Sequence, residues 1–272
     1  MHTIEVVNDM LVRRMGDGDA RKLLCLHGFA DSGLMFLPLS KTALPDCFEL
    51  VLVDLPGFGC SPSKRGIALI RDYARAVARL APVISHREPI GLIGHSIASA
   101  IAVVAAELLS PPPIGVFSIE GNLTEDDAYF TGKTAEWEAA EPFKEAFSNE
   151  IWELGATNLE LRRYFGGVIM AQASAMWSLG KDAKRLSAGD SLGHAYRALK
   201  VPKLYYWSEA TTPARTRQFI DAYSIPNRRY AAASHWPTIA DPQATANSIM
   251  EFFLNLPNRP LQITSGGLSE LK

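Results

Sequence analysis

The chain has 272 residues, a near balance of 27 basic against 29 acidic residues, a net charge of −2 and 47% hydrophobic residues. This length predicts one large domain, or a domain with an insertion, that buries a substantial core. The balanced charge gives no reason to expect a nucleic-acid partner, and no apolar stretch reaches the roughly 20 residues that a membrane span needs. Three cysteines without metal-ligand spacing and the lack of a signal-like start predict a cytoplasmic protein that uses no metal or cofactor.

The first part of the chain predicts strands separated by turns and helices. Residues 3–14 read as a hairpin around Asn8-Asp9, and further strands are expected at 22–26 and 48–53. A helix is expected at about 34–43, and residues 69–84 have the apolar stripe of an amphipathic helix. His27-Gly28-Phe29 follows the first of these buried strands, and a glycine there lets the backbone approach a ligand closely.

The most informative stretch is a serine between a strand and a buried helix. Residues 90–93 read as a buried strand and residues 97–109 as a helix that is apolar on every face, so Ser96 lies at a sharp turn. Gly94 and Ala98 flank it at two residues on either side, where larger side chains of strand and helix would collide. The turn also places the N–H of Ile97 at a helix N-terminus, where an oxyanion can be stabilised.

The remainder of the chain continues the alternation after a long interruption. Strands are expected at 114–119, 203–207 and 229–233, with helices at about 213–222 and 241–254, the latter with Asp241 as its N-cap. The segment 121–201 is helical by pattern and rich in aromatic residues, of which a minority should line a pocket and the rest should be core. Residues 257–272 read as a poorly ordered tail.

The sequence around Ser96 resembles the nucleophile elbow Gly-x-Ser-x-Gly of the α/β-hydrolase family, with Ala98 in place of the second glycine. Asp54-Leu55-Pro56-Gly57-Phe58-Gly59-Cys60-Ser61 resembles a structural loop of the same family. The resemblance implies a mostly parallel eight-stranded sheet flanked by helices, with residues 1–120 and 202–256 as the core and 121–201 as a helical cap inserted after the sixth strand. It also implies that the N–H of Phe29 completes the oxyanion hole with that of Ile97.

A serine hydroxyl needs a base, and the base needs an orienting partner. His235 lies in a Ser-His-Trp-Pro sequence after the last strand, where the resemblance places the base, whereas the side chain of His95 should point away from the nucleophile. The acid is expected to be Glu120, at the end of the sixth strand, with Glu209 as the alternative. The Glu120 position resembles that in haloalkane dehalogenases and zearalenone lactone hydrolases. Asp126 and Asp127 fit the start of a helix better.

These residues predict a serine hydrolase of the carboxylesterase or lactonase class that acts on a moderately sized apolar ester or lactone. Gly28, His95 and Trp236 are expected to lie near the substrate, and the protein to be a monomer or homodimer. Three alternatives remain: cleavage of C–C bonds, transfer of the acyl group to another acceptor, and ligand binding with little turnover.

Overall fold

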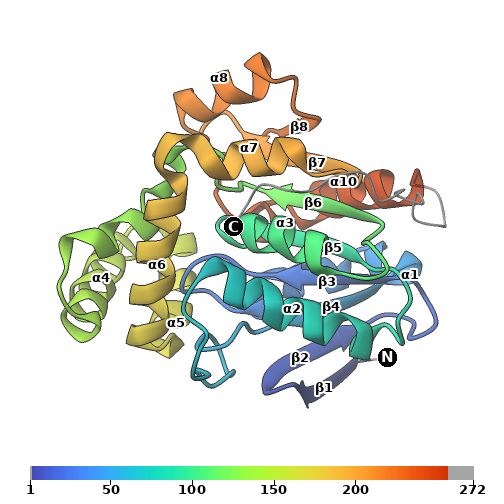
Figure 1. Ribbon diagram of the computed structural model, residues 1–272, viewed down its shortest axis with the longest axis horizontal. Helices are drawn as coiled ribbons and strands as arrows, with labels where there is room; N and C mark the ends of the chain where they lie inside the picture. Colours follow the sequence, from blue (N-terminus) through green and yellow to red (C-terminus); the bar gives the residue numbers. More distant parts are fainter. Residues whose placement is uncertain (1, 257–272) are drawn as a thin grey trace.

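The computed structural model describes residues 2–256, which form one eight-stranded sheet with helices on both faces (Figure 1). The strands are β1 (His2–Val7), β2 (Met10–Met15), β3 (Lys22–Leu26), β4 (Glu49–Val53), β5 (Gly91–His95), β6 (Gly115–Ile119), β7 (Lys203–Ser208) and β8 (Asn227–Tyr230). Their order across the sheet is β1-β2-β4-β3-β5-β6-β7-β8. β2 is antiparallel to both of its neighbours, and β4 to β8 run parallel with β3.

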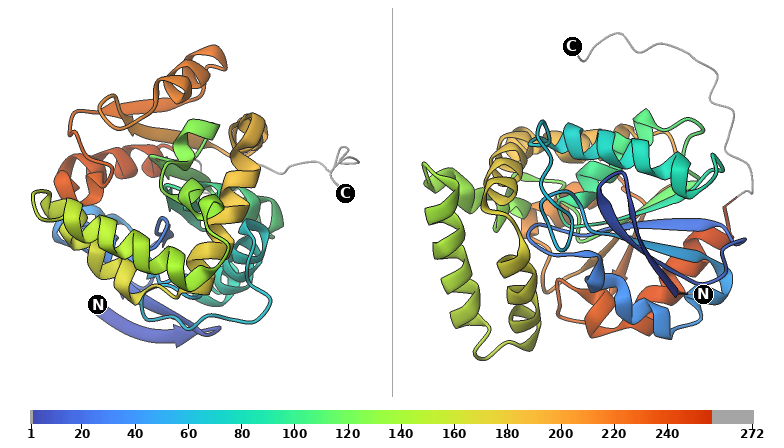
Figure 2. Two further views of the ribbon diagram at one scale, coloured as in Figure 1. Left: turned by 90° about the vertical axis from the view of Figure 1, so that its left-hand side faces the viewer. Right: turned by 90° about the horizontal axis from the view of Figure 1, so that it is seen from below.

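Helices cover both faces of this sheet, which explains why the central strands are apolar throughout. Every residue of β3, β4, β5 and β6 is buried. Figure 2 shows α2 (Ile70–Ile84) and α3 (Ala98–Leu108) on one face, with α1 (Leu44–Cys47) and α10 (Pro242–Leu254) on the other. Because β3 to β8 run parallel, their carboxyl ends lie at the same edge of the sheet, where ligands of such sheets bind.

The segment between β6 and β7 contains helices and no strand, as expected. We call residues 121–201 the helical segment; its residues 140–187 lie at one end of the sheet in both figures. Its elements are η2 (Glu125–Ala128), η3 (Thr131–Glu136), α4 (Ala140–Leu154), α5 (Leu159–Met170), α6 (Ala173–Ser187), η4 (Ala188–Asp190) and α7 (Ser191–Ala198). Among residues 2–256, no helix combines the length and the apolar character needed to cross a bilayer.

Two expected elements differ from the sequence prediction. Residues 34–43 were expected to be one helix, but the chain forms a 3₁₀ helix, η1 (Gly33–Lys41), before the short α1. Pro38 inside it lacks the N–H that an α-helix would use. The last strand is residues 227–230, earlier than the expected 229–233, because its ladder with β7 ends where Ser208 pairs with Tyr230. The chain then turns toward His235.

The C-terminal part of the fold follows the prediction closely. α8 (Ala214–Ala222) and α9 (Pro237–Ala240) precede the closing helix α10. The Asp241 side chain caps α10 by accepting a hydrogen bond from the N–H of Ala244 at 3.0 Å, and Pro242 occupies the first turn. The tail expected at 257–272 lies outside the described residues.

Candidate active site

The turn between β5 and α3 holds Ser96 in a left-handed backbone conformation, with φ of +53°. This conformation costs a non-glycine residue on the order of 1–2 kcal/mol, and the N–H of Ser96 is fixed by a 2.8 Å hydrogen bond to the carbonyl of Ile119. A side chain at Gly94 would place its Cβ 2.6 Å from the carbonyl oxygen of Ala98 and 2.8 Å from Ser99. The close approach of strand and helix therefore requires glycine at this position, and it presents Ser96 at the carboxyl edge of the sheet.

The loop after β3 is fixed by His27. The carbonyl of Gly28 can only accept a hydrogen bond, so Nδ1 of His27 donates to it at 2.8 Å, while Nε2 accepts from the N–H of Leu55 at 2.9 Å. Burial lowers the pKa of His27, which keeps the ring neutral for both bonds. Within residues 2–256, neither the N–H of Phe29 nor that of Ile97 donates a hydrogen bond to another residue. Both donors remain available to a ligand.

Glu120 is a buried carboxylate just past the end of β6, with φ of +47° and only 3% of its side chain exposed. Its oxygens accept hydrogen bonds from the N–H of Ser208 at 2.7 Å, the hydroxyl of Tyr230 at 2.8 Å and the hydroxyl of Thr211 at 2.9 Å. One oxygen also lies 3.5 Å from Nδ1 of His235. A buried charge is tolerated when it is hydrogen-bonded in this way, and here it faces an imidazole.

His235 and Ser96 line one cavity at the carboxyl edge of the sheet. The cavity also has aromatic walls and polar groups from the helical segment; its other lining residues are Phe29, Asp31, His95, Asp127, Tyr129, Phe130, Thr131, Tyr164 and Trp236. Its volume is about 10 Å³, close to the space that one water molecule needs. Burial raises the pKa of Asp127 in its wall to about 6.

A hydroxyl on a tight strand-to-helix turn, an imidazole in the same cavity and a buried carboxylate beside that imidazole are the parts of a serine hydrolase site. The sequence model of the alpha/beta hydrolase family matches residues 23–248, which include all three. The chain belongs to this family. No curated protein matches it.

Solved structures of several hydrolases have the same fold as this alpha/beta hydrolase. E-2-(acetamidomethylene)succinate hydrolase is 21% identical, with a TM-score of 0.72 over 93% of this chain and 99% of that one. An N-acyl homoserine lactonase complexed with N-hexanoyl homoserine is 14% identical, with a TM-score of 0.73 over 98% and 99%. An esterase from Rhodococcus sp. ECU1013 is 16% identical, with a TM-score of 0.70 over 94% and 99%. At these identities the likeness establishes the fold and leaves the substrate open. The narrower resemblance to dehalogenases and zearalenone hydrolases stays a prediction.

The two candidate acids lie in different surroundings in this hydrolase. Glu209 is 61% exposed and pairs with Arg217 at 3.4 Å and Arg229 at 2.7 Å. It is thus engaged with two arginines at the surface, whereas Glu120 lies beside the imidazole of His235. The geometry favours Glu120. Asp127 starts a helix, as expected, because its side chain accepts from the N–H groups of Leu123 and Thr124 ahead of η2.

The side chain of His95 was expected to point away from the nucleophile, but it lines the same cavity as Ser96. Its Nε2–H donates to the carbonyl of His235 at 2.8 Å, and the two rings lie 4.7 Å apart between centroids. Burial, reinforced by the nearby His235, lowers the pKa of His95 well below its ordinary value, so it stays neutral and acts as a donor to the His235 loop. His95 and Trp236 line the cavity, whereas Gly28 does not line it and instead packs against His95.

Sequence analysis missed the residues that the helical segment contributes to the cavity. Of the aromatic residues in the helical segment, Tyr129, Phe130 and Tyr164 line it, whereas Trp152 is 62% exposed. Tyr129 and Phe130 line the cavity from a stretch without strand or helix periodicity, so no sequence pattern marks them. Arg163 of α5 binds the buried Asp31 at 2.6 Å, and the hydroxyl of Tyr164 donates to the carbonyl of Phe29 at 2.7 Å. These two bonds join the helical segment to the His27-Gly28-Phe29 loop.

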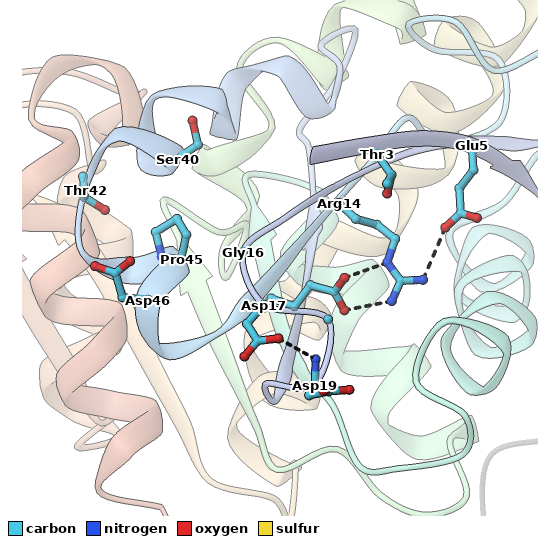
Figure 3. Close-up of a pocket in the computed structure, with 12 residues that line it drawn as sticks. Thr3, Glu5, Arg14, Gly16, Asp17, Asp19, Ser40, Thr42, Pro45 and Asp46 are labelled. Atoms are coloured by element: carbon cyan, nitrogen blue, oxygen red, sulfur yellow. Dashed lines mark hydrogen bonds and ion pairs between the residues drawn. The ribbon is translucent and has the colours of Figure 1, made fainter. Parts of the chain in front are cut away.

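A larger hollow of about 1090 Å³ lies elsewhere, where β2 ends and β4 begins (Figure 3). Arg14 there binds Glu5 and Glu49, and Asp17 accepts from the N–H of Asp19. Its lining includes the hydroxyl of Ser40 and no histidine that could activate it. This hollow opens at the amino end of the parallel strands and lacks the groups of a hydrolytic site, so the small cavity at the carboxyl edge is the better candidate.

Gly28→Ala is expected to disturb the loop that carries Phe29. The added Cβ would lie 2.7 Å from Nδ1 of His95 and 3.0 Å from Cβ of Ser96, so one of these groups must shift. We expect a loss of about 1–3 kcal/mol in the free energy of unfolding and a lower kcat, measured by denaturant unfolding and ester turnover. Gly18→Ala is the matched control, because nothing lies within 4 Å of a Cβ there. Equal behaviour of the two variants would contradict the packing argument.

Proposed function

We propose that this alpha/beta hydrolase cleaves a carboxylic ester or lactone through an acyl-enzyme intermediate. Ser96 is the nucleophile, His235 the general base, Glu120 the carboxylate that orients the base, and the N–H groups of Phe29 and Ile97 form the oxyanion hole. The observation that carries the proposal is the placement of His235, which shares a cavity with Ser96 while its Nδ1 lies 3.5 Å from the buried Glu120.

In the first step Nε2 of His235 takes the proton of the Ser96 hydroxyl while its oxygen bonds to the substrate carbonyl carbon. The carbonyl oxygen becomes an oxyanion that accepts from the two backbone N–H groups. The imidazolium is stabilised by Glu120 and then returns the proton to the leaving alcohol as the C–O bond breaks. Water repeats the sequence on the acyl-enzyme and frees Ser96.

The substrate is proposed to be a moderately sized molecule with apolar parts. Five aromatic residues wall the cavity: Phe29, Tyr129, Phe130, Tyr164 and Trp236. A volume of about 10 Å³ cannot hold an ester, so we propose that the helical segment acts as a cap and moves to admit it. Two of the structural neighbours, a lactonase and an esterase, are compatible with an ester or lactone substrate.

A fluorophosphonate probe is expected to label the protein once, at Ser96, because such probes react with serines that a nearby base has activated. Labelling is measured by intact mass and located by peptide mass spectrometry, with Ser96→Ala as the control. Unlabelled wild-type protein, or labelling that persists in the variant, would refute the assignment. Turnover of short p-nitrophenyl esters without cleavage of a vinylogous diketone would separate ester from C–C hydrolysis.

A further inference from the structure

Two side chains compete for Nδ1 of His235. The hydroxyl oxygen of Tyr129 lies 2.8 Å from this nitrogen, and the nearest oxygen of Glu120 lies 3.5 Å away. Only the first distance is that of a hydrogen bond. A neutral imidazole carries one N–H, so Nδ1 either donates its proton or accepts one from Tyr129.

The partners of the surrounding groups decide between these two arrangements. Within residues 2–256, the Tyr129 hydroxyl has one hydrogen-bond acceptor within reach, Nδ1 of His235. Loss of solvent, together with the charges of Glu120 and Asp127, raises the pKa of Tyr129 well above its ordinary value, so it keeps a proton to donate.

Glu120, in contrast, does not depend on a proton from the imidazole. Its oxygens already accept from the N–H of Ser208 and from the hydroxyl of Thr211. The hydroxyl of Tyr230 lies 2.8 Å from Glu120 and 2.7 Å from the carbonyl of Ser234, so its one proton is shared between these two acceptors. The Tyr129 hydroxyl can therefore donate to Nδ1 without taking a donor away from Glu120. The proton of the neutral imidazole then resides on Nε2, the nitrogen that must be free of a proton to act as a base.

We propose that Tyr129 is a positioning residue that holds His235 in the non-productive Nε2–H tautomer until the helical segment moves. The proposal rests on the proposed function, because it assigns Nε2 as the base. It adds that Nδ1 of His235 bonds either to Tyr129 or to Glu120 and never to both at once. Tyr129 belongs to the helical segment, whereas Glu120 follows β6.

The position of Tyr129 links this competition to substrate binding. Tyr129, Phe130 and Thr131 line the cavity of about 10 Å³, so an ester cannot bind unless such residues move. Tyr129 as a whole is 39% exposed, so packing does not fix it on every side. Displacement of Tyr129 breaks its bond to Nδ1 and leaves Glu120 as the acceptor for an Nδ1–H. Substrate binding thereby produces the tautomer that can accept the proton of Ser96.

The tautomer is measured directly on the ligand-free protein. In a long-range ¹H–¹⁵N correlation spectrum of ¹⁵N-histidine-labelled protein at alkaline pH, His235 is expected as the Nε2–H tautomer. Tyr129→Phe is expected to convert it to the Nδ1–H tautomer, with its protonated nitrogen toward Glu120. Tyr164→Phe is the matched control, since it removes another cavity hydroxyl that binds the carbonyl of Phe29 and not His235. A His235→Gln sample assigns the signal.

Kinetics provide the second readout. Tyr129→Phe is expected to raise kcat/KM for a short p-nitrophenyl ester by about two- to tenfold, the value of one hydrogen bond that no longer competes. An Nδ1–H tautomer in the wild type, an unchanged tautomer in Tyr129→Phe, or a lower kcat/KM in that variant would overturn the proposal. The spectra report the tautomer of His235 even if no ester is hydrolysed. Fluorophosphonate labelling tests the proposed function separately, so a failure of that function is distinguished from a failure of this inference.

Discussion

Ser96→Ala is expected to lower kcat on short esters by on the order of 10⁶, to the level of the assay background, because the covalent intermediate can no longer form. The stability should change little. The Ser96 side chain sits at the cavity, where it is partly exposed, and the turn is held by the backbone bond to Ile119 and by the packing at Gly94. Turnover and thermal unfolding, measured on the same preparation, separate the two effects.

Ser40→Ala is the control matched in residue type, because Ser40 lines the larger hollow of Figure 3. We expect it to leave kcat unchanged. Loss of activity in Ser40→Ala alone would move the catalytic site to the amino end of the strands. Equal turnover in wild type and Ser96→Ala would refute Ser96 as the nucleophile, whereas no turnover in either protein, with retained ligand binding, would favour a binding protein of this fold.

The parts of the fold that short-range patterns determine were predictable. β3 has the expected bounds, 22–26, because its five residues form one continuous buried run with loops on either side. α10 starts at Pro242 because an aspartate cap and a proline in the first turn act locally. The end of β8 was not predictable, since it depends on where β7 stops providing partners, and β7 is distant in sequence.

The residues of the candidate site fall into the same two groups, those marked by the local sequence and those that depend on distant contacts. Ser96 is marked by small neighbours two residues away and His235 by its place after the last strand, and both signals lie in the local sequence. The choice of Glu120 over Glu209 depends on partners far along the chain, such as Tyr230, which donates to Glu120 from 110 residues away. Tyr129 depends on how the helical segment packs over the sheet, so only the structure connects it to His235.

Three of the residues with a strained backbone lie at this site. Ala30, Ser96 and Glu120 each have a positive φ, between +47° and +53°, although none is glycine. Each lies just after the end of a neighbouring parallel strand, β3, β5 or β6. Residues held in this region persist where the surroundings fix them, and such residues cluster at functional sites. The core of the sheet thus supplies the rigidity that holds the loop, the turn and the carboxylate in place.

Glu120→Gln is expected to lower kcat by about 10⁴, the effect of replacing the acid of a serine triad by its amide. The amide keeps the size of the carboxylate, and its remaining oxygen can accept from Ser208 and Tyr230 as Glu120 does. Its NH₂ group, however, donates toward Nδ1 of His235 and favours the Nε2–H tautomer. We also expect a loss of about 1.5–3 kcal/mol in the free energy of unfolding, since hydrogen bonds to a charge are replaced by weaker ones.

Glu209→Gln provides the matched control for this prediction. It removes the same charge from an exposed carboxylate that pairs with Arg217 and Arg229. Exposed ion pairs contribute about 0–1 kcal/mol, so we expect nearly wild-type stability and unchanged kcat. Steady-state kinetics and urea unfolding of the two variants decide between the glutamates. If Glu209→Gln alone abolished turnover, the acid would lie on the loop after β7, and the bonds of Glu120 to Ser208, Thr211 and Tyr230 would serve only to fix the end of β6.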